Sequence, residues 1–259
     1  MGIFEAAAGA FSLFSVFPVP GRLAEQGLRS RWLLCAFPLV GAAVGLVCWG
    51  WVWLCDWLGV PDLLRGAFLC LIPPALTGGI HLDGYADTCD ALGSHSTPER
   101  KQRILRDPHC GAFAVIRLGM YFTGALALCT ALPPQAVPAL GWLLVFSRTL
   151  AAGLTASLPP APESAMGRTL HAGADKWTRA VLYIEAGIAG AGLCLSTDHA
   201  VKVLLLTVPV VLVLLCRCTR LVRADFGGFS GDLAGWFLTK LEFWMLAMLV
   251  LSAFLEAEP

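Results

Sequence analysis

The sequence predicts an all-α integral membrane protein, a polytopic bundle of transmembrane helices. Three properties of its 259 residues indicate this class: 57% are hydrophobic, only 14% are charged, and Lys plus Arg equal Asp plus Glu at 18 each. A soluble domain carries roughly 25% charged residues, so this chain has too little charge to coat a water-facing surface. The zero net charge argues against a nucleic-acid-binding protein, which has a basic excess. The apolar content argues against disorder.

Seven stretches of the sequence are long and apolar enough to cross a bilayer, which takes about 20 residues. In order, they cover residues 33–54, 66–82, 113–132, 139–156, 180–196, 203–222 and 234–254. Residues 3–17 are apolar but short and end at Phe17-Pro18-Val19-Pro20, which predicts an interfacial or re-entrant helix. We see no soluble appendage and no internal repeat, so we expect one membrane-embedded domain over residues 1–259.

Lys and Arg are divided unequally between the two sides of the predicted bundle. Most lie in the connections 21–32, 83–112 and 157–179 or at the adjacent helix ends, whereas the opposite side has only Arg65 and Lys202. The basic side of a membrane protein faces the cytoplasm. We therefore expect a multi-pass protein of the cytoplasmic membrane.

Three aspartates with helical spacing follow the second predicted span. In a helix, Asp83, Asp87 and Asp90 would lie at positions i, i+4 and i+7 and share one face. Three carboxylates on one stripe repel one another and disfavour the helix unless a cation is present. Oxygen ligands suit a hard cation, so these residues are predicted to bind Mg²⁺, with Mn²⁺ as an alternative. A solvated loop with incidental acids is the other interpretation.

A short basic amphipathic helix is predicted after this acidic segment. It starts at Thr97-Pro98-Glu99 and ends at Asp107-Pro108. Such a basic run often contacts lipid headgroups or solvent, but beside a metal cluster it can also bind phosphates. Both interpretations stay open at this point. Its cations are Arg100, Lys101, Arg103 and Arg106.

A second polar site is predicted at the glycine-rich stretch before the last span, Phe226–Asp232. Backbone N–H groups of a glycine turn at a helix start can bind an anion, and Asp232 could ligate a metal or hold a substrate hydroxyl. A tight turn alone explains the glycines. It does not explain Lys240 and Glu242 within an apolar helix, where ionised groups are usually functional. These two residues do not face each other, so their partners, and that of Arg148, should lie on other helices.

Together these residues resemble the adenosylcobinamide-GDP ribazoletransferases, the cobalamin-5′-phosphate synthase family of vitamin B12 biosynthesis. The longest matching block is Thr77-Gly-Gly-Ile-His-Leu-Asp-Gly-Tyr-Ala-Asp-Thr-Cys-Asp90. Shorter matches are Phe17–Pro20, Phe37–Gly41, Arg106-Asp107 with Gly111, Ser147-Arg148, and Gly227–Asp232 with Glu242. The sequence departs from the family pattern at Ala91, Pro108-His109 and Ala114. An arginine is common at position 109, so a phosphate contact there depends on His109.

The resemblance implies Mg²⁺-dependent transfer of adenosylcobinamide phosphate from adenosylcobinamide-GDP to α-ribazole or α-ribazole 5′-phosphate. GMP is released, and the product is adenosylcobalamin or its 5′-phosphate. Asp83, Asp87 and Asp90 would hold the metal, and Asp90 or His81 would accept the hydroxyl proton. The expected partners are the two substrates and the lipid bilayer, without nucleic acid, and a homo-oligomer stays open. Expected substrate contacts are Arg100, Arg103, Arg106, Asp107, Arg148, Gly228, Ser230, Gly231, Asp232 and Glu242.

Two other functional classes share some of these features. A secondary transporter would use intramembrane charges, but its site usually lies at the bilayer midplane between repeats, whereas these acids lie at one edge. A CDP-alcohol phosphotransferase has a similar Asp-Gly motif, which in this sequence is Asp83-Gly84-Tyr85-Ala86. It is disfavoured because Ala86 is followed by Asp87, where that motif has Arg.

Overall fold

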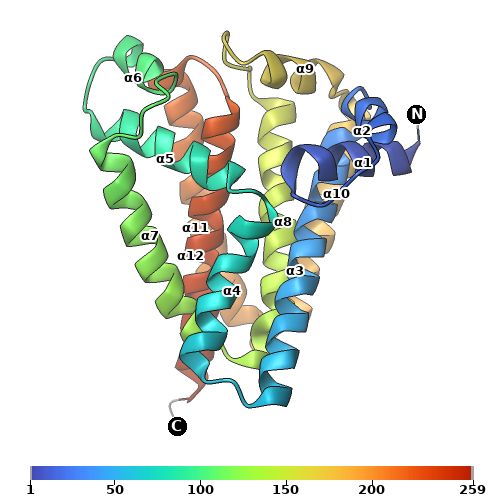
Figure 1. The fold of residues 1–259 in the computed structure, drawn as a ribbon, viewed down its shortest axis with the longest axis vertical. Coiled ribbons are helices and arrows are strands. Elements are labelled where there is room, and N and C mark those ends of the chain that lie inside the picture. The colour runs from blue at the N-terminus through green and yellow to red at the C-terminus, as the bar shows by residue number, and fades with distance from the viewer. Residues whose placement is uncertain (1, 258–259) are drawn as a thin grey trace.

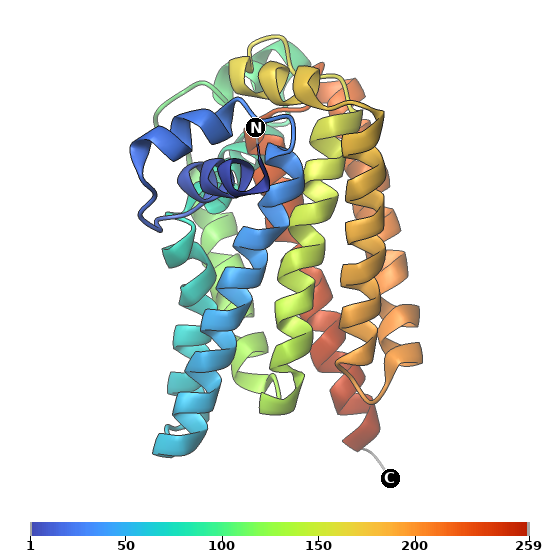
Figure 2. The ribbon, with the colours of Figure 1, turned by 90° about the vertical axis from the view of Figure 1, so that its right-hand side faces the viewer.

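The computed structural model describes residues 2–257, which form twelve α-helices and no β-strand. Six of these helices are long and apolar enough to span a membrane. They stand side by side in an upright bundle (Figures 1 and 2), which confirms the predicted polytopic helical membrane fold. The six are α3 (Leu33–Leu58), α7 (Ala112–Ala131), α8 (Val137–Ser157), α10 (Lys176–Leu195), α11 (Ala200–Leu221) and α12 (Gly231–Ala257).

The second predicted span, residues 66–82, is wrong at its C-terminal end. The helix α4 (Asp62–Leu76) stops there, and α5 (Ile80–Gly93) continues at 90° to it. Gly78 and Gly79 make this turn with φ angles of +62° and +75°, a left-handed conformation that glycine adopts at little cost. As a result α5 runs across the bundle, outside the membrane-spanning segments, while α4 stays upright (Figure 1).

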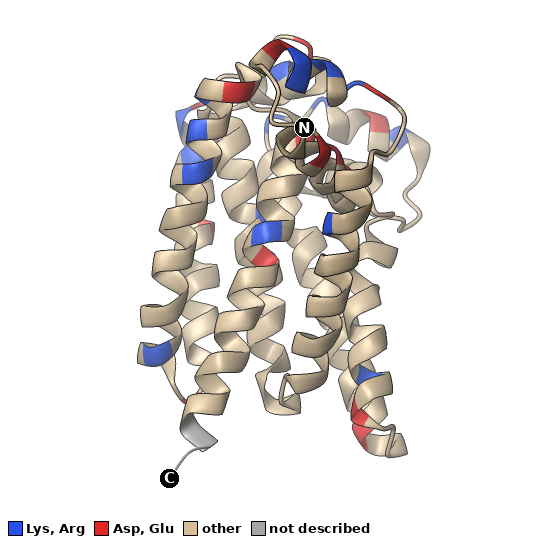
Figure 3. Ribbon diagram, turned by 90° about the vertical axis from the view of Figure 1, so that its left-hand side faces the viewer, with Lys and Arg blue, Asp and Glu red and all other residues tan. Residues whose placement is uncertain are grey.

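Polar segments gather at one end of the bundle, which we call the charged end. It contains α5, α6 (Pro98–Ile104) and α9 (Ala165–Gly173), and Figure 3 shows most acidic and basic residues around it. The few charges at the opposite end include Arg65, which lies 2.8 Å from Asp62. The charged residues, unevenly distributed along the sequence, are therefore also concentrated at one end of the folded bundle.

The N-terminal segment forms a helical hairpin at the charged end, beside the bundle (Figure 2). Its helices are α1 (Ile3–Phe14) and α2 (Gly21–Leu28). They cross so closely that a Cβ atom on Gly9 would lie 2.5 Å from the carbonyl carbon of Gly27. With 12 residues, α1 is too short to span a bilayer, as the sequence predicts.

The transmembrane helices α3 and α8 also approach each other through glycine. A Cβ atom on Gly45 would lie 2.7 Å from the Cα atom of Gly141. Membrane helices gain packing contacts when small residues let their backbones come close. This close approach lets α3 and α8 pack against each other along the bundle.

We expect Gly45→Ala to lower the Tm of the detergent-purified protein, because the added methyl group meets backbone atoms that cannot move aside. Overpacking of this kind costs about 1–3 kcal/mol. Gly50→Ala is the matched control on the same helix, since nothing lies within 4 Å of the Cβ it would gain. Thermal unfolding of both variants tests the contact, and equal Tm values would contradict it.

Candidate functional site

The helix α5 crosses α12 at a place where both helices lack side chains. A Cβ atom on Gly84 would lie 2.7 Å from the Cα atom of Asp232, and one on Gly235 would lie 2.7 Å from the carbonyl oxygen of His81. The hydroxyl of Thr239 also donates a hydrogen bond of 3.3 Å to that carbonyl oxygen. This crossing brings Asp232, at the start of α12, beside the aspartates of α5.

Four aspartates therefore gather at the charged end, three from α5 and one from α12. Asp83, Asp87 and Asp90 lie in one helix, as their spacing predicts. The pKa of Asp87 is raised to about 6, first by burial and then by the negative charges of Asp83, Asp232 and Asp90. The other three carboxylates therefore all lie within electrostatic range of Asp87.

This acidic group fits a divalent cation by its chemistry. Within residues 2–257, none of the four carboxylates forms an ion pair with Lys, Arg or His. Asp83 is exposed, whereas Asp87, Asp90 and Asp232 are partly buried. Partly buried carboxylates without a cationic partner are costly, and a hard cation with oxygen ligands would compensate them. In the described part of the chain, however, no three His, Cys, Asp or Glu side chains converge into a preformed metal site. Ligand side chains would therefore have to move when a cation binds.

Asp90 is the outlying member of the group. Its two carboxylate oxygens lie against Gly111 at the start of α7, 2.2 Å from the place that a Cβ atom on Gly111 would take. Asp83, in contrast, is the charge that raises the pKa of Asp87 most. Asp83, Asp87 and Asp232 thus form the more closely associated set, although the sequence places Asp90 with the first two.

The glycine loop, Gly227–Gly231, is fixed to the segment that follows α8. The N–H group of Phe229 donates to the carbonyl oxygen of Pro159 at 2.8 Å, and that of Ala161 donates to the carbonyl oxygen of Phe229 at 3.0 Å. Glycine is required at position 228, because a Cβ atom there would lie 2.4 Å from the Cα atom of Ala161. The loop therefore holds Asp232 in place beside α5.

Two cavities open on either side of the glycine loop and share Ser164, Ser230, Gly231 and Asp232 in their walls. The apolar cavity has a volume of about 200 Å³. Its wall is mainly aliphatic and aromatic, with Asp83 and His81 also contributing. The polar cavity has a volume of about 330 Å³ and is lined by Gln102, Arg106 and Glu163 among others.

The segment 159–167, which lines both cavities, was missed by the sequence analysis. It contributes Ser164 to the shared wall and Glu163 to the polar cavity. The cluster Leu158-Pro159-Pro160-Ala161-Pro162 was the only signal, since prolines of this density predict an extended connection. Such a connection can pair with another backbone segment, as this one does with Phe229.

The segment after the basic helix α6 contributes one cation to these cavities. Arg106 lines the polar cavity and lies 3.2 Å from Glu163. Lys101 pairs with Asp225 at 2.5 Å, which ties α6 to the turn before the glycine loop. The remaining predicted contacts of this segment, Arg100, Arg103 and Asp107, are exposed and line neither cavity. The backbone N–H of His109 donates to Asp107 and holds the pKa of that carboxyl below its usual range.

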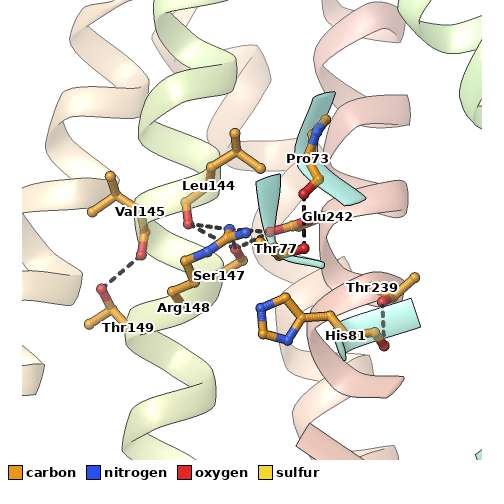
Figure 4. Close-up of polar contacts among 10 residues, drawn as sticks. All are labelled: Pro73, Thr77, His81, Leu144, Val145, Ser147, Arg148, Thr149, Thr239 and Glu242. Carbon is orange, nitrogen blue, oxygen red and sulfur yellow. Dashed lines mark hydrogen bonds and ion pairs between the residues drawn. The ribbon is translucent and has the colours of Figure 1, made fainter. Parts of the chain in front are cut away.

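An ion pair joins α8 to α12 in the bundle interior, close to the start of α5 (Figure 4). The guanidinium of Arg148, 1% exposed, lies 2.6 Å from the Glu242 carboxylate. The Ser147 hydroxyl donates to the same oxygen at 2.7 Å. This confirms that Arg148 and Glu242 find their partners on other helices, and Lys240 lies over the Tyr85 ring at 5.7 Å. Neither Arg148 nor Glu242 lines the apolar or the polar cavity, so their contact with substrate stays a prediction.

His81 lies between the buried ion pair and the apolar cavity. Its imidazole points from α5 toward the region of Arg148 (Figure 4) and is flanked by Phe14 and Phe37, with ring centroids at 6.4 and 5.7 Å. Its Nε2 atom is buried and has no hydrogen-bond partner among the described residues. A buried polar atom without a hydrogen-bond partner in the protein normally bonds to a water molecule or a ligand.

Comparison with known proteins identifies the family. The family described as Cobalamin-5-phosphate synthase matches residues 6–250. Among relatives named adenosylcobinamide-GDP ribazoletransferase, one from Lachnoclostridium phytofermentans is 35% identical over 90% of this chain and 88% of its own. One from Nitratidesulfovibrio vulgaris is 35% identical over 77% of each chain, and one from Clostridium botulinum is 29% identical over 93% of this chain and 94% of its own. No solved structure matches the chain. With a family match over nearly its whole length, the chain belongs to the cobalamin-5-phosphate synthase family of enzymes.

Proposed function

We propose that this protein transfers adenosylcobinamide phosphate from adenosylcobinamide-GDP to α-ribazole or α-ribazole 5′-phosphate and releases GMP. We further propose that it works in the cytoplasmic membrane, with the charged end facing the cytoplasm. Family membership and the names of the relatives support the class of reaction. The observation that supports the site is the position of Asp232 in the wall shared by the two cavities, beside Asp83 and Asp87. Two substrates and a cation could meet there.

The reaction exchanges one phosphorus–oxygen bond for another. A ribose hydroxyl oxygen of the acceptor bonds to the phosphorus that carries the corrinoid. The bond from this phosphorus to the bridging oxygen of the diphosphate breaks, and that oxygen leaves with GMP. The hydroxyl proton passes to a base on the protein. The attacking hydroxyl must be present in both proposed acceptors. Because one of them carries a phosphate at the 5′ position, the attacking hydroxyl is not the 5′-hydroxyl.

The acidic group needs a cation before it can receive a diphosphate, since like charges repel strongly in a partly buried site. We propose that Asp83 and Asp87 hold Mg²⁺, or Mn²⁺ in its place, with Asp232 and Asp90 within reach as further ligands. When bound, the ion would neutralise charge on the diphosphate and on its leaving oxygen. Asp83 and Asp232, which line the cavities, would then position the reacting groups at their junction.

Two residues are proposed as the base that accepts the hydroxyl proton, Asp90 and His81. His81 lines the apolar cavity and its Nε2 atom has no partner within the described residues, but burial and then the charge of Arg148 lower the pKa of its imidazole to about 3, which makes it a weak base. Asp90 has its carboxylate against Gly111, so the geometry ranks neither residue above the other. A base must come within hydrogen-bonding distance of the proton it accepts, and His81 borders the space available to an acceptor.

Vesicles containing the purified protein should release GMP when given Mg²⁺, adenosylcobinamide-GDP and α-ribazole. We expect Asp83→Asn and Asp87→Asn each to lower this rate by about 10³-fold, the size of effect seen when a site loses electrostatic stabilisation. Glu25→Gln, an exposed carboxylate on α2, is the matched control and should be fully active.

Each negative outcome of this assay has its own meaning. Without GMP release from the unaltered protein, the proposed reaction is wrong, and CDP-alcohols and a solute-flux assay then test the other two classes. Full activity of Asp83→Asn or Asp87→Asn with an unchanged Mg²⁺ requirement would instead overturn the metal site alone.

Mg²⁺ binding should weaken as the pH falls through about 6. The raised pKa of Asp87 means that this carboxyl gains a proton near pH 6, and the protonated form cannot bind the cation. For simple competition by one proton, the half-saturating Mg²⁺ concentration should rise about fourfold between pH 7.5 and 5.5. Titrations of activity with Mg²⁺ at several pH values measure this half-saturating concentration. A pH-independent half-saturation would argue against Asp87 as a ligand.

Arg106→Ala should raise the KM for adenosylcobinamide-GDP and leave the KM for α-ribazole unchanged. Loss of a charge-assisted hydrogen bond to phosphate costs about 1.5–3 kcal/mol, so we expect an increase of at least about tenfold. The control is Arg22→Ala, which removes an exposed cation from α2. If the KM for the corrinoid substrate does not change, Arg106 contacts lipid or solvent and not the substrate.

A further inference from the structure

We propose that the apolar cavity binds the aromatic base of the acceptor nucleoside and that the polar cavity binds the nucleotide that leaves. The proposal rests on the proposed function and adds to it an assignment of the two substrates to two subsites. It follows from the size of each cavity, the chemistry of its wall, and the position of the acidic group between them.

The size of the apolar cavity limits what it can hold. At about 200 Å³, it is smaller than the roughly 300–1,000 Å³ pockets that take drug-sized ligands. A corrinoid cannot enter it, but a bicyclic aromatic ring can. The wall combines aromatic side chains with small ones that leave room for a flat ring, and includes Phe14, Phe37, Ala151, Ala152, Gly167 and Leu170.

The chemistry of this wall selects between the two bases in the reaction. Its polar side chains include Thr155, Ser164 and His81, besides the acids at the shared wall. Guanine has several hydrogen-bond donors and acceptors, and moving such groups into an apolar space without partners costs several kcal/mol. The fused aromatic base of α-ribazole loses few hydrogen bonds there and gains contact with apolar surface. The apolar cavity therefore suits the acceptor.

The polar cavity has the complementary character. It offers the side chains of Gln102, Arg106 and Glu163, and it is larger, at about 330 Å³. Arginine binds phosphate oxygens in a bidentate way, and the amide and carboxylate groups match the hydrogen-bonding edge of a purine. A nucleotide bound here would have its phosphates near the glycine loop.

The wall shared by the two cavities then becomes the reaction centre. It consists of Ser164, Ser230, Gly231 and Asp232, and Asp83 lies in the wall of the apolar cavity next to it. An acceptor whose base fills the apolar cavity would have its ribose at this junction, beside the acids. The same arrangement gives α1 a role, because Phe14 at its end packs on Phe37 with ring centroids 4.2 Å apart and closes one side of the cavity.

Two variants that reduce the apolar cavity test the assignment. Ala152→Leu adds a side chain from the buried wall, and Met166→Trp covers the rim from α9, where Met166 is 53% exposed and a larger ring does not disturb the bundle core. We expect each to raise the KM for α-ribazole at least about tenfold and to change the KM for adenosylcobinamide-GDP less than about twofold. Gly153→Val is the control on α8, because nothing lies within 4 Å of its added Cβ.

Binding without turnover provides a second measurement. Equilibrium dialysis of nanodisc-embedded protein should show that Met166→Trp loses α-ribazole but keeps GMP, and that Arg106→Ala does the reverse. The assignment is overturned if both KM values rise equally, if the KM for α-ribazole stays unchanged in both variants, or if the dialysis pattern is inverted. Because dialysis needs no catalysis, it tests the subsites even where the unaltered protein releases no GMP, the result that overturns the proposed function.

Discussion

The crossing of α5 over α12 is the contact on which the site depends. Gly84 and Gly235 remove the side chains that would separate the two helices, and the glycine turn after α4 gives α5 the direction it needs for the crossing. Asp232 is more than 140 positions away from Asp83 and Asp87 along the sequence, and only this backbone contact brings the three together. Any side chain at either glycine would push α5 away from α12, and the acidic group would lose its member from α12.

The charged residues of the bundle interior and those of the acidic group differ in how they are neutralised. Arg148 and Glu242 lie within the apolar bundle, where they neutralise each other at 2.6 Å and Ser147 adds a hydrogen bond. Removing one partner of such a pair would leave an uncompensated buried charge. Asp83, Asp87, Asp90 and Asp232 at the charged end, in contrast, have no cationic partner in the described part of the chain. A membrane protein retains costly groups where they have a function, so the paired charges fit a structural role and the unpaired acids fit a ligand site.

Hydropathy and spacing predicted the parts of this structure that depend on local sequence. The spans, the short N-terminal helix and the helical stripe of Asp83, Asp87 and Asp90 were found because period and length are visible in one segment. The end of α4 was missed, since Ile80 and Leu82 continue the apolar run beyond the glycine turn. The pairing of Arg148 with Glu242 and of Ala161 with Phe229 could not be assigned, because each joins segments at least 68 positions apart in the sequence. Backbone hydrogen bonds such as those of Phe229 also depend little on residue type, so they are hard to predict from the sequence.

The segments that do not cross the membrane explain how a bundle of apolar helices can host polar chemistry. Upright helices alone would present their ends to water and leave the space between α3, α8 and α12 open at the charged end. The α1–α2 hairpin and α9 cover this space from two sides, with Phe14 and Leu170 in its wall, and α5 supplies acids at its edge. The result is a mainly apolar cavity that borders carboxylates, and electrostatic interactions in such surroundings are stronger than in bulk solvent. In the proposed reaction, the corrinoid substrate is too large for this cavity and would approach from outside, and the reacting groups would meet at the wall that contains Asp232.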